Sequence, residues 1–355
     1  MIIKIEMKKV PFIFLLSLMI FECKEEKSNS VVTDDNRLKI ETKKFDESTY
    51  VLNDSFAYGD ARRYGVTASN AGSSHPFSGK NRMTTVLDMA EESGMEISFP
   101  SGYYKMDLTL DSRKNLNLRF DNSEFNLIHI AQVKKTLPIP ENITIKGTLI
   151  AYARLGMTEA RNISIDSVIL KSDVSKNLWK LRNTGCHIYH GCKNIKINYL
   201  EVQDLGSGSD KYKYTHAALA IDGYNNNPEN VQIKKVHIKS TDRHGIYITG
   251  KDHLIGEVII DKFGIGSSKD MDGMQDAAKG EEKDFKALWV NKCYDSFIEK
   301  ITINEKNAKA KYTAHFDSGD KNRPFIIRSF RVINDNPNIN FLEEENHGVV
   351  IEIME

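Results

Sequence analysis

Short β-rich runs recur along the chain from about residue 116, and they constrain the fold more than any other sequence feature. Many of these runs open with Asn and then alternate Ile or Val with polar residues, as in NITIKGTLIAY, NISIDSVIL, NIKINYLEVQDL and NVQIKKVHIKS. Alternation with a period of two predicts β-strands. Strands that recur about every 20 to 40 residues predict a solenoid, because one such unit cannot bury its apolar face without a neighbour.

A helix and a strand are expected before these runs, in residues 81–104, NRMTTVLDMAEESGMEISFPSGYY. We expect Thr84 or Thr85 to cap a helix that continues through Glu92 and ends at Gly94. This unit, with rungs such as GIYITG and IGEVIIDKF, resembles the pectin-lyase-like superfamily over roughly residues 55–355. The resemblance implies an all-β fold, a right-handed parallel β-helix with an N-terminal helical cap, and a carbohydrate substrate. A fold alone does not identify the chemistry.

The first 23 residues have the pattern of an export signal. Lys8 and Lys9 precede the apolar run VPFIFLLSLMIF, which is too short to span a bilayer. Cys23 follows and resembles the lipidated cysteine of a bacterial lipoprotein, and the KEE after it resembles the export tag of Bacteroidota surface lipoproteins. We therefore divide the chain into a signal (1–23), a charged tether (24–46) and a β-helix domain (47–355). We expect a lipid anchor in the outer membrane; the alternative is a secreted protein.

Charge balance excludes one class of partner. The chain has 49 basic and 49 acidic side chains and a formal net charge of +0, whereas a nucleic-acid-binding domain is usually clearly basic. We therefore expect no nucleic-acid partner, and we expect a monomer.

The cysteines do not predict a disulfide framework, because only Cys186, Cys192 and Cys293 follow Cys23. In CHIYHGC, Cys186, His190 and Cys192 would share one face of a strand, which is the pattern of a metal site. We favour buried structural cysteines and predict no metal ligands. No cofactor is required by any pattern, although the acidic segment KDMDGMQD, residues 269–276, offers oxygen ligands for calcium without the spacing of an EF-hand.

Stacking the rungs in register separates inward from outward positions. Two columns are almost wholly apolar and are predicted to face the core: Tyr189, Ile221, Ile248, Val290, Phe316, and His187, Leu219, Ile246, Leu288, Ala314. Three further columns are predicted to face outward: His190, Asp222, Thr249, Asn291, Asp317; then Ile188, Ala220, Tyr247, Trp289, His315; and Thr184, His216, Arg243, Phe285, Lys311. Exposed rings beside cations and carboxylates are typical of a sugar-binding groove. The alternative is that Tyr247 and Trp289 only pack under a covering loop.

Extra loop length points to the same face. The surplus residues lie at 206–215, GSGSDKYKYT, and at 266–284, GSSKDMDGMQDAAKGEEKD. Long loops on a rigid scaffold usually carry function. We expect both segments to form the walls of a cleft around His216, Arg243 and Lys286.

The residues on this face favour lyase chemistry. A polysaccharide lyase needs a base and a cation that neutralises a uronate carboxylate, whereas a glycoside hydrolase needs two carboxyl groups about 5 to 9.5 Å apart. Asp222 and Asp317 would lie three rungs, or roughly 14 Å, apart. We predict His216 or Tyr247 as base and Arg243 as the carboxylate's partner, with Lys286 and His244 as reserves. The predicted substrate-binding residues are His190, Asp222, His244, Trp289, Asn291, His315 and Asp317.

Two other functions stay open on the same scaffold. One is a glycoside hydrolase that uses Asp222 with Asp242 or Asp284, and the other is a non-catalytic glycan-binding β-helix. The rung motifs of the superfamily's polygalacturonases are absent from the solenoid, and RPFIIR, residues 323–328, departs from the spacing of the pectate-lyase motif. Neither pectin activity is therefore implied.

Overall fold

The structure is a computed structural model that describes residues 45–180, 182–204, 217–265, 285–344 and 348–355. Residues Phe45–Glu355 form one compact unit. Cys23, His216, Asp284 and the two predicted loop segments, 206–215 and 266–284, lie outside the described residues.

A helical cap precedes the strands. The 3-10 helix η1 (Ala61–Tyr64) and the α-helix α1 (Arg82–Ser93) pack on each other, and α1 packs against the first long strand, β4 (Lys114–Ala131). The N-cap is Asn81, whose side chain accepts a hydrogen bond from the Thr84 backbone N–H at 2.6 Å, so the prediction of Thr84 or Thr85 as the cap was wrong. Asn is as good a cap as Thr, and it stands one turn earlier. Gly94 ends the helix in the left-handed conformation, as predicted.

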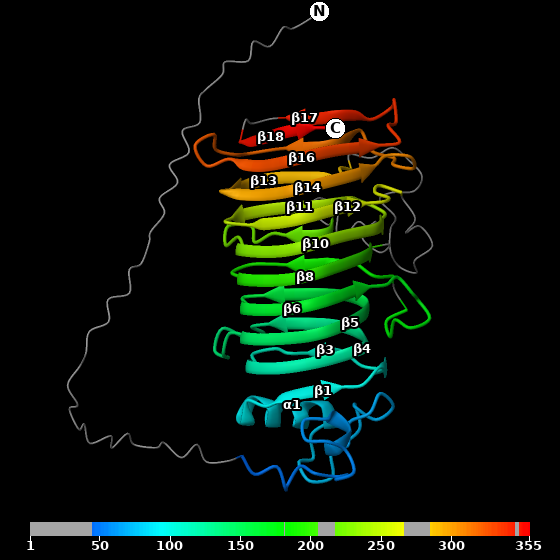
Figure 1. Cartoon of the computed structure of the whole chain (residues 1–355), viewed down its shortest axis with the longest axis vertical. Helices are drawn as coiled ribbons and strands as arrows, with labels where there is room; N and C mark the ends of the chain where they lie inside the picture. The colour runs from blue at the N-terminus through cyan, green and yellow to red at the C-terminus, as the bar shows by residue number, and fades with distance from the viewer. Residues whose placement is uncertain (1–44, 181, 205–216, 266–284, 345–347) are drawn as a thin grey trace, which may run out of the picture. The chain divides into compact units, whose positions relative to one another are not determined.

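The described residues form eighteen strands, and every pairing between them is parallel (Figure 1). Their bounds, besides β4, are β1 Glu96–Phe99, β2 Gly102–Tyr103, β3 Leu108–Thr109, β5 Glu141–Thr158, β6 Arg161–Leu170, β7 Cys186–Ile188, β8 Lys193–Asp204, β9 Ala217–Ile221, β10 Glu229–Thr241, β11 His244–Lys251, β12 Leu254–Ile260, β13 Leu288–Tyr294, β14 Ser296–Asn304, β15 Tyr312–Phe316, β16 Phe325–Ile333, β17 Asn340–Glu344 and β18 Val349–Met354. The predicted parallel β-helix is confirmed.

The strands form successive rungs of a solenoid. Strands β6, β8, β10, β12, β14, β16 and β18 stack on one side, and β7, β9, β11, β13, β15 and β17 stack on another. Strand β5 is long enough to pair with both β6 and β7, and β4 pairs along its length with β1, β2, β3 and β5. Equivalent residues of successive rungs therefore lie in straight columns about 4.8 Å apart.

Apolar columns fill the interior. In the stack that begins with β6, one column consists of Ile165, Ile197, Ile233, Ile255, Ile298 and Ile327, all essentially unexposed. Burying each of these side chains contributes roughly 1.5–3 kcal/mol relative to leaving it in water. The alternation seen in the sequence is thus the inward and outward alternation of stacked strands.

An asparagine ladder explains why so many runs open with Asn. Asn115, Asn142, Asn162, Asn194 and Asn230 all have positive φ, between 52° and 56°. Their side-chain amides join successive rungs through hydrogen bonds of 2.8 to 3.0 Å. Asn tolerates the left-handed conformation better than other residues with a Cβ, so the same residue makes the corner and links the rungs.

The predicted register is confirmed in four rungs and wrong in the fifth. Tyr247 pairs with Ala220 and Trp289, and Trp289 pairs with His315, as predicted. In β7, however, His187 rather than Ile188 lies beside Ala220, and Ile188 lies beside Ile221. The apolar Cys186 and Ile188 take the inward positions and turn His187 outward, because a one-residue shift exchanges the two faces of a strand. The shift also moves His190 out of the Asp222 column.

Candidate functional site

One outward column of the second stack carries a row of three consecutive rings, Tyr247, Trp289 and His315. The whole column consists of His187, Ala220, Tyr247, Trp289, His315 and Glu343. The ring centroids of Tyr247 and Trp289 are 4.9 Å apart, and those of Trp289 and His315 are 5.2 Å apart with 26° between the ring planes. Tyr247 and His315 are only 4% and 6% exposed. The rings were predicted to stand open to solvent; instead they stack on one another at the rung spacing and are largely covered.

Cations lie against this row. Lys286 is buried, with its Nζ 5.1 Å from the centre of the Trp289 ring and 3.2 Å from the Glu343 carboxylate. The His315 Nδ1 lies 2.6 Å from the same carboxylate. Glu343 therefore joins two of the predicted site residues. Sequence reasoning missed Glu343, although carrying the register one rung beyond His315 would have found it.

Arg243 and His244 lie on the same side of the solenoid. The Arg243 guanidinium lies 5.4 Å from the centre of the Phe285 ring, and the ring centres of His244 and Trp289 are 5.3 Å apart. The His244 Nδ1 accepts a hydrogen bond from the Lys286 backbone N–H at 3.1 Å, which leaves the ring proton on Nε2. The structure thus brings Arg243, His244, Tyr247, Lys286, Trp289 and His315 together. Arg243 and His244 are buried.

A hollow of about 300 Å³ opens beside Tyr247, and we call it the Tyr247 hollow. It is lined by Asp222, Tyr224, Asn225, Asn227, Tyr247, Thr249, Asn291 and Lys292. The Asn291 side-chain amide donates a hydrogen bond of 3.1 Å to the Tyr247 hydroxyl. The Asn291 Oδ1 is buried and has no hydrogen-bond partner among the described residues. Tyr224 is 82% exposed, so it offers an open ring face at the rim.

The Tyr247 hydroxyl is held in its protonated form. Burial is the largest of the effects that raise the pKa of Tyr247 to about 12; the nearby carboxylates of Asp222 and Asp317 act in the same direction, and the hydrogen bond from Asn291 opposes them. The hydroxyl oxygen already accepts from Asn291, so its own proton is available for a ligand. The hollow therefore combines a neutral hydroxyl donor with amide groups, a carboxylate and an exposed ring.

The two aspartates of the adjacent column do not form a carboxylate pair. Their neighbours Ile221 and Phe316 are three rungs apart through Ile248 and Val290, a separation of about 14 Å at about 4.8 Å per rung. Each carboxylate also accepts a local backbone hydrogen bond, Asp222 from Tyr224 and Asp317 from Ser318. Asp242, the acid proposed for the hydrolase, is completely buried.

His190 lies beside the loop that lines the hollow. Its Nδ1 is 3.1 Å from the Gly223 carbonyl oxygen, so Nδ1 donates its proton to that oxygen. His187, one of the outward rings, has a pKa lowered to about 3, mainly by burial and then by Arg154. It is therefore neutral at physiological pH.

The thiols and acidic groups of the described segments form no cluster of three or more metal-ligating residues. Cys186 and Cys192 are buried and unpaired; burial raises the pKa of the Cys186 thiol and brings that of Cys192 to about 12. The calcium candidate at 269–276 lies outside the described residues. No helix in the described ranges is both long and apolar enough to cross a bilayer.

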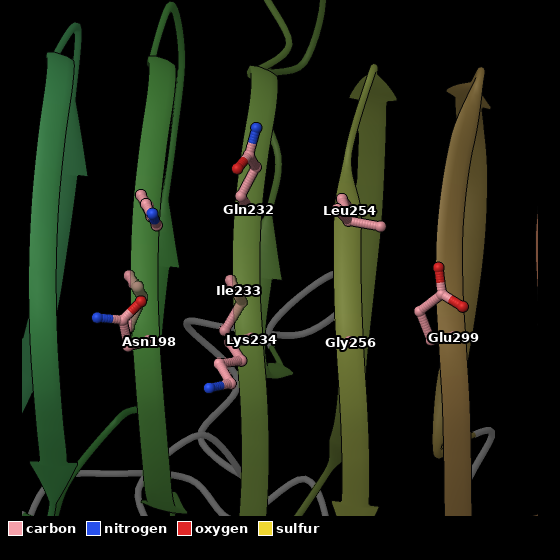
Figure 2. A pocket seen from close by; sticks show the side chains of 9 residues that line it. Asn198, Gln232, Ile233, Lys234, Leu254, Gly256 and Glu299 are labelled. Carbon is pink, nitrogen blue, oxygen red and sulfur yellow. The ribbon is translucent and has the colours of Figure 1, made fainter. Parts of the chain in front are cut away.

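A second, larger hollow of about 420 Å³ lies on the other stack and contains none of the predicted site residues. Figure 2 shows its side chains on successive strands, with Asn198, Gln232, Lys234, Leu254 and Glu299 around the bare backbone of Gly256. Glu299 is engaged by Arg328 at 2.7 Å. This hollow arises where Gly256 interrupts a column of longer side chains. Because it contains no predicted site residue, it supplies the control variant in the binding experiment below.

Comparison of the chain with protein-family models, curated proteins and solved structures found no match.

Proposed function

We propose that this protein is a polysaccharide lyase that acts on an anionic, uronate-containing glycan. The supporting observation is the Tyr247 hydroxyl, which lines the hollow, is oriented by Asn291 and keeps its proton. Exposed Tyr224 beside amide and carboxylate groups fits the way sugars are held, by ring faces and by hydrogen bonds to hydroxyls.

In the proposed reaction a base removes the proton next to the uronate carboxylate. The released electron pair forms the carbon–carbon double bond, and the bond to the glycosidic oxygen breaks. Tyr247 donates its proton to that leaving oxygen, a role that a hydroxyl with a raised pKa suits better than the role of base. We assign the role of the base to His216. Arg243 supplies the positive charge that neutralises the uronate carboxylate, and Lys286 is the reserve candidate for this role.

The proposal includes export. The pattern of residues 8–23 supports a signal and a lipid anchor at Cys23, and the charged residues 24–46 supply a tether. We propose a monomer at the cell surface with no nucleic-acid partner.

A glycan-binding protein without catalysis is the second candidate, and one observation favours it. Arg243 and Lys286 are 3% and 1% exposed, so a substrate that needs to contact either cation would have to displace the groups that cover it. The wide spacing of Asp222 and Asp317 argues against a hydrolase that uses these two acids.

The test is a screen of the full chain against uronate, sulfated and neutral polysaccharides, following ultraviolet absorbance of the unsaturated product and new reducing ends together. For a lyase both signals rise on one uronate polymer, and Tyr247→Phe lowers the rate by about 10²- to 10⁴-fold. Tyr199→Phe is the matched control, since the Tyr199 hydroxyl bonds to Glu201 on the other stack. Reducing ends without absorbance would identify a hydrolase, and binding without either signal would identify the glycan-binding protein.

A further inference from the structure

A third hollow, of about 290 Å³, continues the Tyr247 hollow, and we call it the basic hollow. The two share Asn225, Asn227 and Lys292 in their walls. The remaining lining of the basic hollow is Asn226, Pro228, Glu229, Gly250, Lys251, Tyr294 and Arg323. A chain of linked sugars that enters the Tyr247 hollow can therefore extend past Lys292 without leaving the protein surface.

Both walls of the basic hollow are fixed before any ligand binds. Asn226 accepts a hydrogen bond of 2.8 Å from the Gly191 backbone N–H through its carbonyl oxygen, and its side chain donates to Glu159. The Asn227 side chain accepts from the Gly223 backbone N–H at 3.2 Å. On the opposite wall Gly250 has a φ of 106°, and a Cβ there would lie 2.1 Å from the Pro228 carbonyl oxygen. Strand β11 thus ends directly against the loop, and the hollow needs little ordering on binding.

Three cations surround this hollow, and their partners differ. Arg323 is held by Asp295 at 2.5 Å and lies 5.2 Å from the centre of the Tyr294 ring. Lys251 lies 3.6 Å from Glu229, which also bonds to Lys193 at 3.0 Å. Lys292 is exposed and makes no ion pair with the described residues, although its backbone is fixed by a hydrogen bond from its N–H to the Ser318 carbonyl oxygen. Of these three cations, the one that has no ion-pair partner in the described part of the chain thus lies at the junction of the two hollows.

We infer that the basic hollow is a subsite for an acidic substituent, a carboxylate or a sulfate, on the sugar adjacent to the one at Tyr247. This inference rests on the proposed glycan binding. Lys292 supplies the charge that the anion neutralises, and Lys251 adds a second positive charge nearby. The Tyr294 ring and the amides of Asn225 and Asn227 provide apolar and polar contacts for the same sugar.

The test is the affinity of the full chain for four polymers: polygalacturonate, its carboxyl-reduced counterpart, dextran sulfate and dextran. Lys292→Gln removes the charge and retains most of the side-chain length. We expect it to weaken binding of an acidic polymer about 5- to 20-fold, the effect of losing one charge-assisted contact near the surface, and to leave binding of its neutral counterpart unchanged. Lys234→Gln, in the hollow of Figure 2, is the matched control and is expected to change neither affinity.

The two acidic polymers distinguish a carboxylate subsite from a sulfate subsite. Equal affinities of Lys292→Gln and the unchanged chain for both acidic polymers would overturn the inference, and so would an equal loss in Lys234→Gln, which would mean general surface attraction. Tyr247→Phe separates the two proposals. If Tyr247→Phe no longer forms product while Lys292→Gln binds acidic polymers as the unchanged chain does, the lyase proposal stands and the subsite inference fails. If Tyr247→Phe forms product at the unchanged rate while Lys292→Gln binds acidic polymers more weakly, the subsite inference stands and the lyase proposal fails.

Discussion

Replacing Asn162 tests whether the asparagine ladder contributes to stability through its backbone conformation or only through its hydrogen bonds. Asn162 has a φ of 53°, donates to Asn142 at 3.0 Å and accepts from Asn194 at 2.8 Å. Asn162→Ala removes both side-chain hydrogen bonds and puts a residue that disfavours the left-handed region at the corner. Asn162→Gly removes the same bonds but accepts that conformation without strain.

The magnitudes follow from these contacts. The amide bonds are exposed, so each contributes about 0.5 kcal/mol, the low end of the usual net value. The left-handed conformation costs Ala roughly 1–2 kcal/mol. We therefore expect Asn162→Ala to lower the free energy of unfolding by about 2–3 kcal/mol. Asn162→Gly loses about 1 kcal/mol from the hydrogen bonds and a further few tenths from the greater entropy of the unfolded chain.

Urea unfolding, monitored by circular dichroism, ranks the variants by stability. The unfolding midpoint is expected to fall in the order unchanged chain, Asn162→Gly, Asn162→Ala, provided that the slopes of the transitions agree. Asn340→Ala is the control, because Asn340 is exposed in β17 and does not have a positive φ. If Asn162→Ala proves as stable as Asn162→Gly, the left-handed corner contributes nothing and the conformational part of the argument is wrong.

Two further predictions concern a second corner and the site. Gly147→Ala is expected to destabilise the protein by at least 2–3 kcal/mol, because Gly147 has a φ of 75° and a Cβ there would lie 2.1 Å from the Phe120 carbonyl oxygen. Thermal unfolding measures this loss, and the control is Gly72→Ala, whose added Cβ would meet no neighbour within 4 Å. The raised pKa of Tyr247 predicts that its stabilising contribution is fully present below the ordinary tyrosine pKa near 10 and is lost as pH rises from about 10 to 12. Urea midpoints of the unchanged chain and Tyr247→Phe from pH 7 to 12 test this, and parallel pH curves would contradict it.

Local patterns predicted the repeating architecture because each rung carries its own information. Alternating Ile and Val determine which face turns inward, and the recurring Asn marks the corner, so the stacked columns follow without knowledge of distant contacts. The wrong register in β7 has the same cause. His187 and Tyr189 flank Ile188 there, so the apolar residues of this short strand do not by themselves decide which face turns inward. The choice becomes clear only when the buried Cys186 is counted as apolar, because Cys186 and Ile188 then lie on the same face.

The candidate site was only partly predictable, because the column pattern predicts which side chains are neighbours but not whether other residues cover them. Register placed Tyr247, Trp289 and His315 in one row, and the structure keeps them there. Whether a ring in that row is open or covered depends on what packs over it. The open ring of the site is instead Tyr224, in the turn GYNNNP, where no strand pattern marks it. The Asn-rich turn after Asp222 was the available signal, since such loops on a rigid scaffold often carry function.

The burial of Lys286 and Arg243 shifts the centre of the proposed chemistry towards Tyr247. A buried cation costs free energy unless it is paired, and Glu343 at 3.2 Å from Lys286 provides such a partner. A lysine engaged in this way stabilises the row of rings through charge and through its contact with Trp289, and it contributes to the field at the site without touching a ligand. The groups at the lining of the hollows are different: the Tyr247 hydroxyl, the Asn291 amide and the charge of Lys292, which forms no ion pair with any residue that the structure describes. If the protein acts on an acidic glycan, these groups in the walls of the hollows rather than Lys286 and Arg243 therefore set which sugar it accepts.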